Sequence, residues 1–191
     1  MRLLLIGAPG AGKGTQAERL STRLGIAHIS SGDLLRQHVR ERTSLGQTIK
    51  SYVDNGDLVP DGVVMDMLRK PVLAAAKAGG YVLDGFPRTV EQAKASFPTA
   101  HALGVEAGRG TPRRRTPGTG APAALPAPRS DDTEAVIDNR LHVYRGKTVP
   151  LLEYYAGREW MFTVDGAQPR DAVHEEIVAR LQKLTVFAAW S

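Results

Sequence analysis

The chain contains no cysteine. Disulfide bonds and zinc sites made of thiolates are therefore excluded, and we expect a reducing, cytoplasmic setting. Long apolar runs are also missing: none approaches the roughly 18 residues that a membrane-spanning helix needs, so we expect no membrane partner. The first residues lead straight into a strand pattern, and we expect no signal peptide. With 42% hydrophobic and 24% charged residues, the 191-residue chain has the composition of one soluble globular domain.

Positive charge is not spread evenly along the chain. The formal net charge is +5, and the segment from Val105 to Arg129 holds five arginines against one acid, a net +4. A basic face distributed over a folded surface would favour a nucleic-acid partner. One local tract is weaker evidence, and this tract lacks the aromatic side chains on which bases stack. We therefore expect no nucleic-acid partner and keep RNA binding as the weakest alternative.

The richest motif follows directly after the first apolar run. Residues 7–15 read Gly-Ala-Pro-Gly-Ala-Gly-Lys-Gly-Thr. The glycines allow successive backbone N–H groups to converge on one anion, and the helix expected next adds the positive end of its dipole. Lys13 supplies a point charge. The general phosphate-loop pattern has a hydroxyl residue directly after the lysine, whereas here Gly14 intervenes and the hydroxyl belongs to Thr15. The motif predicts a bound phosphate group.

Strand and helix signals alternate through the first two thirds of the chain, as in an α/β fold with a parallel sheet. Short apolar runs predict strands, and longer stretches with helical periodicity predict helices. The expected strands are 3–6, 27–30, 81–84 and 161–164. The expected helices are 13–24, one from 31 onward, a pair around 56 followed by 63–78, one from about 131, and then 151–157 and 170–184.

Two polar clusters follow the second and third expected strands. Residues 30–36 bring hydroxyl, carboxylate and guanidinium groups together. Ligands of parallel sheets bind at the carboxyl ends of the strands. Asp84, at the end of a buried strand, is placed where a magnesium-water ligand belongs, and Arg88 can bind a phosphate bidentately. Each cluster also has a structural explanation, because a helix cap or a tight strand-end turn uses the same residue types.

Five motifs in this order resemble those of the adenylate kinases, whose phosphate loop also has the hydroxyl displaced to the position of Thr15. The motifs are Gly7 to Thr15 with Gln16-Ala17, Ser30 to Arg36, Gly56 to Pro60, Leu83 to Thr89, and Gln92-Ala93. The resemblance covers residues 1–104 and resumes from 129 to about 179. It implies a single P-loop kinase domain over 1–191, with a parallel sheet, helices on both faces, a small helical AMP-binding insert at 31–60 and a short lid.

The resemblance also implies a reaction and its site. The reaction is reversible, magnesium-dependent transfer of a phosphoryl group from ATP to AMP, which gives two ADP, and the expected state is a monomer. The ATP site would comprise Gly10, Ala11, Gly12, Lys13, Gly14, Thr15 and Gln168. The AMP site would comprise Ser31, Arg36, Asp57, Leu58, Val59, Gly85, Arg88 and Gln92, with Gln92 reading the adenine edge. The catalytic cations would be Lys13, Arg88, Arg129 and Arg140. The residues that hold Mg²⁺ through water would be Asp33 and Asp84.

Residues 105–128 depart from the family pattern, which returns over 129–191. The segment holds five prolines and four glycines, which favours neither a helix nor a central strand. The family has a strand here, between its first and last strands, and then an arginine-bearing helix that enters the lid. Loss of that strand would leave a gap beside 161–164. A shifted reading frame, a divergent insert or an unrecognised strand would each explain the segment. A nucleotide-binding but impaired protein, and a kinase of CMP or UMP, therefore stay open as alternatives.

Overall fold

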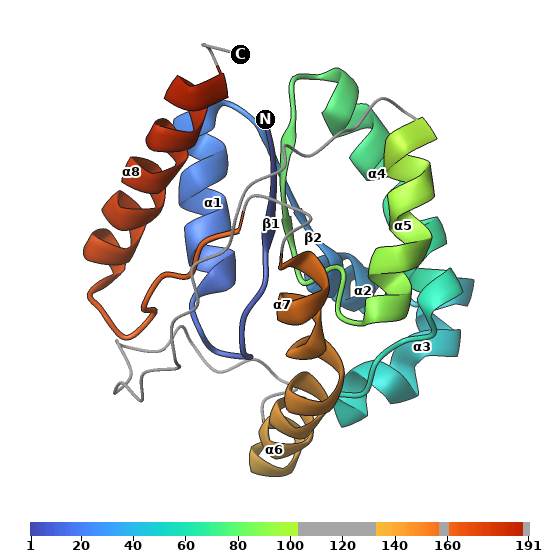
Figure 1. Cartoon of the computed structure of the whole chain (residues 1–191). Coiled ribbons are helices and arrows are strands. Elements are labelled where there is room, and N and C mark those ends of the chain that lie inside the picture. Colours follow the sequence, from blue (N-terminus) through green and yellow to red (C-terminus); the bar gives the residue numbers. More distant parts are fainter. Residues whose placement is uncertain (103–132, 157–160, 189–191) are drawn as a thin grey trace.

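In the computed structural model, which describes residues 1–102, 133–156 and 161–188, three parallel strands form one sheet (Figure 1). They are β1 (Arg2–Leu5), β2 (Ala27–Ser30) and β3 (Tyr81–Asp84), in the spatial order β1-β3-β2. Asp84 of the central strand lies level with Leu5 of β1 and Ser30 of β2. The loops that follow the three strands therefore leave from one edge of the sheet. The predicted α/β fold with a parallel sheet is confirmed.

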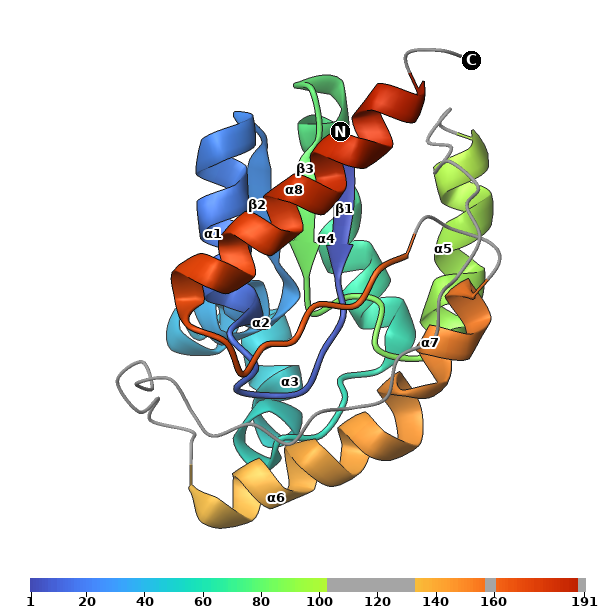
Figure 2. The same ribbon diagram turned by 60° about the vertical axis from the view of Figure 1, so that its left-hand side comes forward.

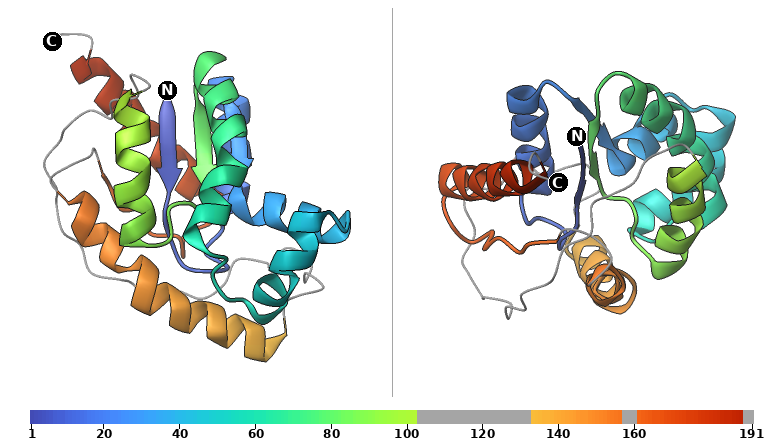
Figure 3. Two further views of the ribbon diagram at one scale, coloured as in Figure 1. Left: turned by 90° about the vertical axis from the view of Figure 1, so that its right-hand side faces the viewer. Right: turned by 45° about the horizontal axis from the view of Figure 1, so that its top comes forward.

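Helices cover both faces of this sheet (Figures 1 and 3). On one face lie α1 (Lys13–Leu24) and α8 (Arg170–Ala188), and on the other lie α2 (Ser31–Arg40) and α4 (Asp61–Lys77). The remaining helices are α3 (Ser44–Asn55), α5 (Val90–Ala102), α6 (Glu134–Val143), the π-helix η1 (Tyr144–Thr148) and α7 (Pro150–Tyr155). Over the ranges that the structure describes, every helix is too short or too polar to cross a bilayer.

Alternate side chains of β3 enter two hydrophobic clusters, one on each face of the sheet. Val82 is fully buried in the cluster between the sheet, α1 and α8, which contains Ala17, Leu20, Val173, Ile177, Val178 and Leu181. Tyr81 and Leu83 belong to the opposite cluster, with Ile29, Leu35, Ile49, Val59, Val64, Leu68, Ala75 and Phe86. Burial on both faces is what an apolar parallel strand requires. The central strand, which ends at Asp84, is therefore the most firmly held element near the site.

Local sequence signals set several element boundaries. Gly25 ends α1 in the left-handed conformation, with φ 63° and ψ 33°, which is a common helix stop. Ser30 caps α2, because its hydroxyl accepts a hydrogen bond from the N–H of Asp33 at 3.2 Å. The predicted bounds 13–24, 27–30 and 81–84 are confirmed. By contrast, α4 begins at Asp61 rather than at 63, and α8 continues to 188 rather than 184.

The predicted strand at 161–164 is wrong. These residues have no regular secondary structure, although Phe162 and Val164 pack against the cluster beside α1 and α8. A strand needs a neighbour for its backbone N–H and C=O groups, and within the described residues β1 pairs with β3 alone. The family strand expected between β1 and this segment falls in 105–128, which lies outside the described residues. The apolar side chains decide where the segment packs, but a strand also requires a partner.

Helix α6 lies beside the connection between α3 and α4 (Figures 2 and 3). Gly56 ends α3 with φ 77°, and a Cβ there would lie 2.9 Å from Cγ of Arg140. The amide Nδ2 of Asn139 donates to the carbonyl of Asn55 at 2.9 Å and to Oδ1 of Asp57 at 2.8 Å. The far end of the predicted AMP-binding insert is thus held by a helix from the C-terminal third of the chain.

Candidate active site

The loop after β1 folds back over the start of α1. Gly10 and Gly12 have φ of +76° and +78°, and nothing lies within 4 Å of the Cβ positions that they lack, so conformation rather than crowding requires glycine. Gly12 is the N-cap of α1, and no side chain of the described residues caps this helix start. Lys13 Nζ donates to the carbonyl of Ala8 at 2.7 Å. Helix N–H groups without a capping side chain, beside an ammonium group, form an anion site.

Asp84 lies against this loop at the end of β3. A Cβ on Gly14 would lie 3.5 Å from Asp84 Oδ2, so the carboxylate is close to the first turn of α1. The other oxygen, Oδ1, is buried and has no hydrogen-bond partner among the described residues. Such an acceptor costs about 1–3 kcal/mol, and a hydrated cation would satisfy it. A carboxylate oxygen in this position fits Mg²⁺ held through water. The described residues form no cluster of three or more side chains that could hold a metal ion directly.

Ser31 and Arg88 converge on one backbone carbonyl, that of Gly85. Ser31 Oγ donates to this oxygen at 2.7 Å and Arg88 Nε donates to it at 2.8 Å. Gly85 has φ +78°, and a Cβ on it would lie 2.8 Å from Ser31 Oγ. Thr148 Oγ1 in turn donates to the carbonyl of Arg88 at 2.9 Å. No role for Thr148 was predicted from the sequence, although its segment fits the family pattern, because its partner lies 60 residues away in the chain.

Gln92 is buried, with 2% of its surface exposed, and both ends of its amide are bonded. Nε2 donates to Asp61 Oδ1 at 2.7 Å, and Oε1 accepts from the backbone N–H of Arg88 at 2.7 Å. Thr89 Oγ1 accepts from the N–H of Gln92 at 3.0 Å and donates to Asp61 Oδ2 at 3.4 Å. The sequence singled out Gln92 but not Asp61, although Asp61 follows directly after the motif at 56–60.

Two residues that the sequence assigned to different ligands contact each other. Arg36 and Asp33 form an ion pair across one turn of α2. The Arg36 side chain is 27% exposed and that of Asp33 is 64% exposed, so water screens the pair and it is readily exchanged for another charge. A Cβ on Gly32 would lie 3.2 Å from both terminal nitrogens of Arg36, so the guanidinium lies over Gly32. The predicted phosphate ligand and the predicted metal ligand are therefore neighbours.

The remaining predicted AMP residues lie in the α3–α4 connection. Val59 is 4% exposed, and its side chain belongs to the core. Leu58 is half-buried and Asp57 is exposed beside α6. Arg140 lies over Gly56 and faces the same connection. Arg129, the fourth predicted catalytic cation, lies outside the described residues, as does the segment 105–128.

The segment that leads into α8 lies close to the phosphate loop. A Cβ on Gly166 would lie 3.5 Å from the carbonyl oxygen of Ala11. Gln168 Nε2 donates to Glu176 Oε2 at 3.0 Å, so this predicted ATP residue is bonded to α8. The contact of this segment with the loop is therefore made at Gly166.

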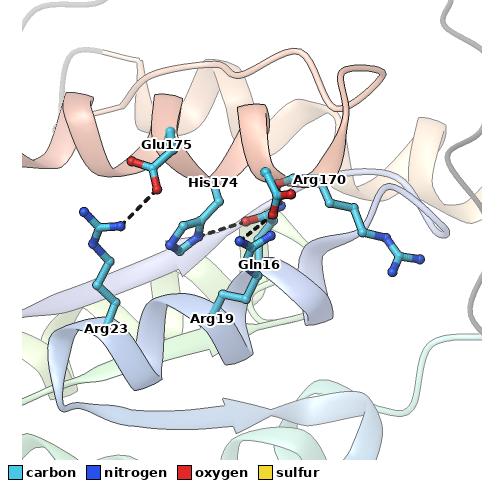
Figure 4. A network of polar contacts seen from close by, with 7 residues as sticks. Gln16, Arg19, Arg23, Arg170, His174 and Glu175 are labelled. Carbon is cyan, nitrogen blue, oxygen red and sulfur yellow. Dashed lines mark hydrogen bonds and ion pairs between the residues drawn. The ribbon is translucent and has the colours of Figure 1, made fainter.

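A buried polar network joins α1 to α8 just behind the phosphate loop (Figure 4). Gln16 Nε2 donates to the carbonyl of Arg170 at 2.9 Å, and Gln16 Oε1 lies 3.2 Å from His174 Nδ1. Because the amide oxygen only accepts, Nδ1 of His174 carries the proton. Burial lowers the pKa of His174, and the positive charges of Arg19 and Arg23 lower it further. Two ion pairs flank the network, Arg19 with Asp171 (2.7 Å) and Arg23 with Glu175 (3.0 Å).

The family described as adenylate kinase matches residues 5–160. Adenylate kinase 1 of Nostoc sp. is 42% identical over 180 residues, which cover 94% of this chain and 98% of the relative. The chain belongs to the adenylate kinase family. Two further adenylate kinases support this assignment: that of Mycobacteroides abscessus is 44% identical over 173 residues (91% of this chain, 94% of the relative), and that of Trichodesmium erythraeum is 40% identical over 190 residues (97% and 100%).

Membership of this family settles the class of reaction. The chain is a phosphotransferase enzyme, and its reaction is ATP + AMP = 2 ADP. The predicted family, fold class and activity are confirmed. The assignment of individual residues to the two nucleotides stays a prediction, although the structure brings most of the described candidates to one edge of the sheet.

Proposed function

We propose that the carboxyl edge of the sheet holds Mg-ATP and AMP side by side for direct phosphoryl transfer. One observation carries this proposal: Leu5, Ser30 and Asp84 lie level across the sheet. The phosphate loop, the start of α2 and the turn after β3 consequently meet at one edge. Phosphoryl transfer depends on positioning and charge stabilisation, and such a meeting point supplies both.

On the donor side, the loop from Gly10 to Thr15 binds the ATP phosphates through backbone N–H groups. Lys13 donates to a carbonyl of its own loop, and this contact is exchangeable for a phosphate oxygen because the ammonium has a flexible stem. The 165–168 segment, which includes Gln168, lies beside Ala11 and accommodates the adenine of ATP. Asp84 and Asp33 would hold Mg²⁺ through water, and Oδ1 of Asp84 would gain a partner when the ion is bound.

On the acceptor side, AMP lies between α2, the α3–α4 connection and the turn after β3. Arg88 and Arg36 bind its phosphate, and Gln92 contacts its adenine. Ser31, Gly85 and the backbone of 57–59 line the rest of this site. The hydrogen bonds on the Gly85 carbonyl support the assignment, because they fix the base of the Arg88 side chain before any ligand binds.

The reaction then needs no general base. An oxygen of the AMP phosphate forms a bond to the γ-phosphorus of ATP while the bond from that phosphorus to the β–γ bridging oxygen breaks. The AMP phosphate is already an anion and serves as the nucleophile. Lys13, Arg88 and Arg140 neutralise the charge on the transferring group, as does Arg129 in the proposed scheme. Magnesium, when bound, stabilises the same charge on the ATP phosphates.

The proposal also covers the oligomeric state and the cellular location of the enzyme. A monomer is what the resemblance to the adenylate kinases implies. A cytoplasmic setting rests on the cysteine-free composition.

A coupled assay of ADP formation tests the proposal. We expect ADP from ATP and AMP, and about a 10³-fold lower kcat in Arg88→Met, because an arginine on the transferring phosphoryl group is worth about that much. Arg69→Met, which removes an exposed arginine of α4, is the matched control and should keep the parent rate. Nucleotide binding without ADP formation would instead support the alternative of a nucleotide-binding protein that is catalytically impaired. A higher rate with CMP or UMP than with AMP would identify a different nucleoside monophosphate kinase.

A further inference from the structure

Asp61 holds the Gln92 amide in one of its two possible orientations. A carboxylate only accepts hydrogen bonds, and a backbone N–H only donates them. Gln92 therefore has to turn its NH₂ group toward Asp61 and its oxygen toward the N–H of Arg88, both at 2.7 Å. Thr89 donates to the second oxygen of Asp61 and so helps to hold the carboxylate in place. The chemistry of the two partners, rather than the placement of atoms alone, fixes the orientation.

We propose that Asp61 is a positioning residue that makes the enzyme select 6-aminopurine over 6-oxopurine nucleoside monophosphates. This inference rests on the proposed function, in which Gln92 contacts the acceptor base. The hydrogen bonds of Gln92 to Asp61 and to the N–H of Arg88 use one N–H and one lone pair of its amide. One N–H donor and one lone pair of the Gln92 amide are left for the base. Adenine offers the matching pair: N1 accepts and the 6-amino group donates. Hypoxanthine and guanine offer the reverse, because their N1 donates and their O6 accepts.

A 6-oxopurine would need the amide turned by 180°. In that orientation Gln92 Oε1 would face the Asp61 carboxylate, and its NH₂ group would face the N–H of Arg88. Both contacts would be repulsive. Gln92 is only 2% exposed, so water does not relieve them. A site that leaves buried polar groups mispaired rejects a substrate far more strongly than one that merely lacks a contact.

A purely structural role for Asp61 makes a different prediction. Asp61 is the first residue of α4, where a carboxylate favours the helix dipole. If this were its only role, its replacement would lower the amount or stability of active enzyme, and activity with every acceptor would fall alike. The ratio of kcat/KM for two acceptors, measured on one preparation, does not depend on how much enzyme is active. That ratio therefore separates the two roles.

The test compares AMP with IMP, which differ only at N1 and the 6-position of the base. In Asp61→Asn the new amide can pair with either orientation of Gln92, and in Asp61→Ala the carboxylate is absent. We expect the AMP/IMP ratio of kcat/KM to fall at least about tenfold in both variants, with the value for IMP rising. A ratio within about twofold of the parent enzyme would overturn the inference. If Asp61→Ala fails to fold, Asp61→Asn decides.

Two further variants complete the design. Glu91→Gln removes an exposed carboxylate from the first turn of the neighbouring α5 and should leave the ratio unchanged. Gln92→Ala tests the proposed function separately, because it should raise KM for AMP and abolish the preference for AMP over IMP. An unchanged KM for AMP in Gln92→Ala would contradict the site itself. A raised KM there, together with an unchanged ratio in the Asp61 variants, would contradict the inference alone.

Discussion

Replacing Gly85 by alanine should damage the AMP side of the site while leaving the ATP side intact. Gly85 has φ +78°, a conformation that costs an L-residue about 1–2 kcal/mol. The new Cβ would also lie 2.8 Å from Ser31 Oγ, so that hydroxyl has to move and its bond to the Gly85 carbonyl is lost, at about 0.5–1.5 kcal/mol. Together we expect the free energy of unfolding to fall by about 1.5–3.5 kcal/mol.

Two other glycines serve as controls that separate backbone strain at positive φ from crowding by the new Cβ. Gly25 has φ +63° with nothing within 4 Å of its missing Cβ, so Gly25→Ala carries the backbone strain alone. Gly62 lies within α4, has no positive φ and no neighbour within 4 Å, so Gly62→Ala should stabilise the protein by about 0.5–1 kcal/mol. Urea unfolding of the three variants separates strain from crowding.

Steady-state kinetics locate the damage. Because Ser31 and Arg88 share the Gly85 carbonyl, we expect KM for AMP to rise about tenfold in Gly85→Ala, and KM for ATP to stay within about twofold. Gly25→Ala should change neither KM. The reasoning is refuted if Gly85→Ala and Gly25→Ala lose equal stability, or if KM for AMP is the same in both.

Three further predictions concern other parts of the molecule. Asp84→Asn should match or exceed the parent in urea midpoint, because the negative charge of a carboxylate with one buried, unpartnered oxygen among the described residues is removed. With magnesium its kcat should nevertheless fall about 100-fold, and a wild-type kcat would contradict the metal assignment. Because the pKa of His174 is lowered in the folded protein, the unfolded chain takes up a proton first as the pH falls below 6.5, and the free energy of unfolding should drop there. Urea titrations between about pH 8 and pH 5 should show a smaller drop in His174→Gln. An unchanged dependence of the free energy of unfolding on pH in this variant would contradict the prediction. Asn139→Ala removes one hydrogen bond to the end of α3 and one to the α3–α4 connection, and it should raise KM for AMP, measured beside the exposed control Asp138→Ala. Equal KM values would show that α6 does not help to hold the insert.

Much of the fold could be predicted because its signals are local. Gly25 marks the end of α1, and the run 81–83 is apolar because both faces of β3 are covered. The phosphate loop and the turn after β3 were recognisable for the same reason. The contacts made by Asp61 and Thr148 were not, because each joins residues far apart in the chain: 31 positions separate Asp61 from Gln92. Helix caps and hydrophobic periodicity are determined by residues close together in the sequence, whereas the hydrogen bonds of Asp61 and Thr148 depend on how distant elements pack.

The failed strand at 161–164 shows how unequally the two halves of the site are supported. β3, which carries Asp84 and leads to Arg88, is paired on both sides and is the most buried strand. β1, which leads to the phosphate loop, pairs on one side within the described residues, and Leu4 is 41% exposed there. Elements with fewer buried contacts open at lower free energy. The acceptor side therefore rests on the firmer strand, while the donor loop depends more on the contacts of α1 with α8, where Gln16 bonds the start of α8 from directly behind the loop.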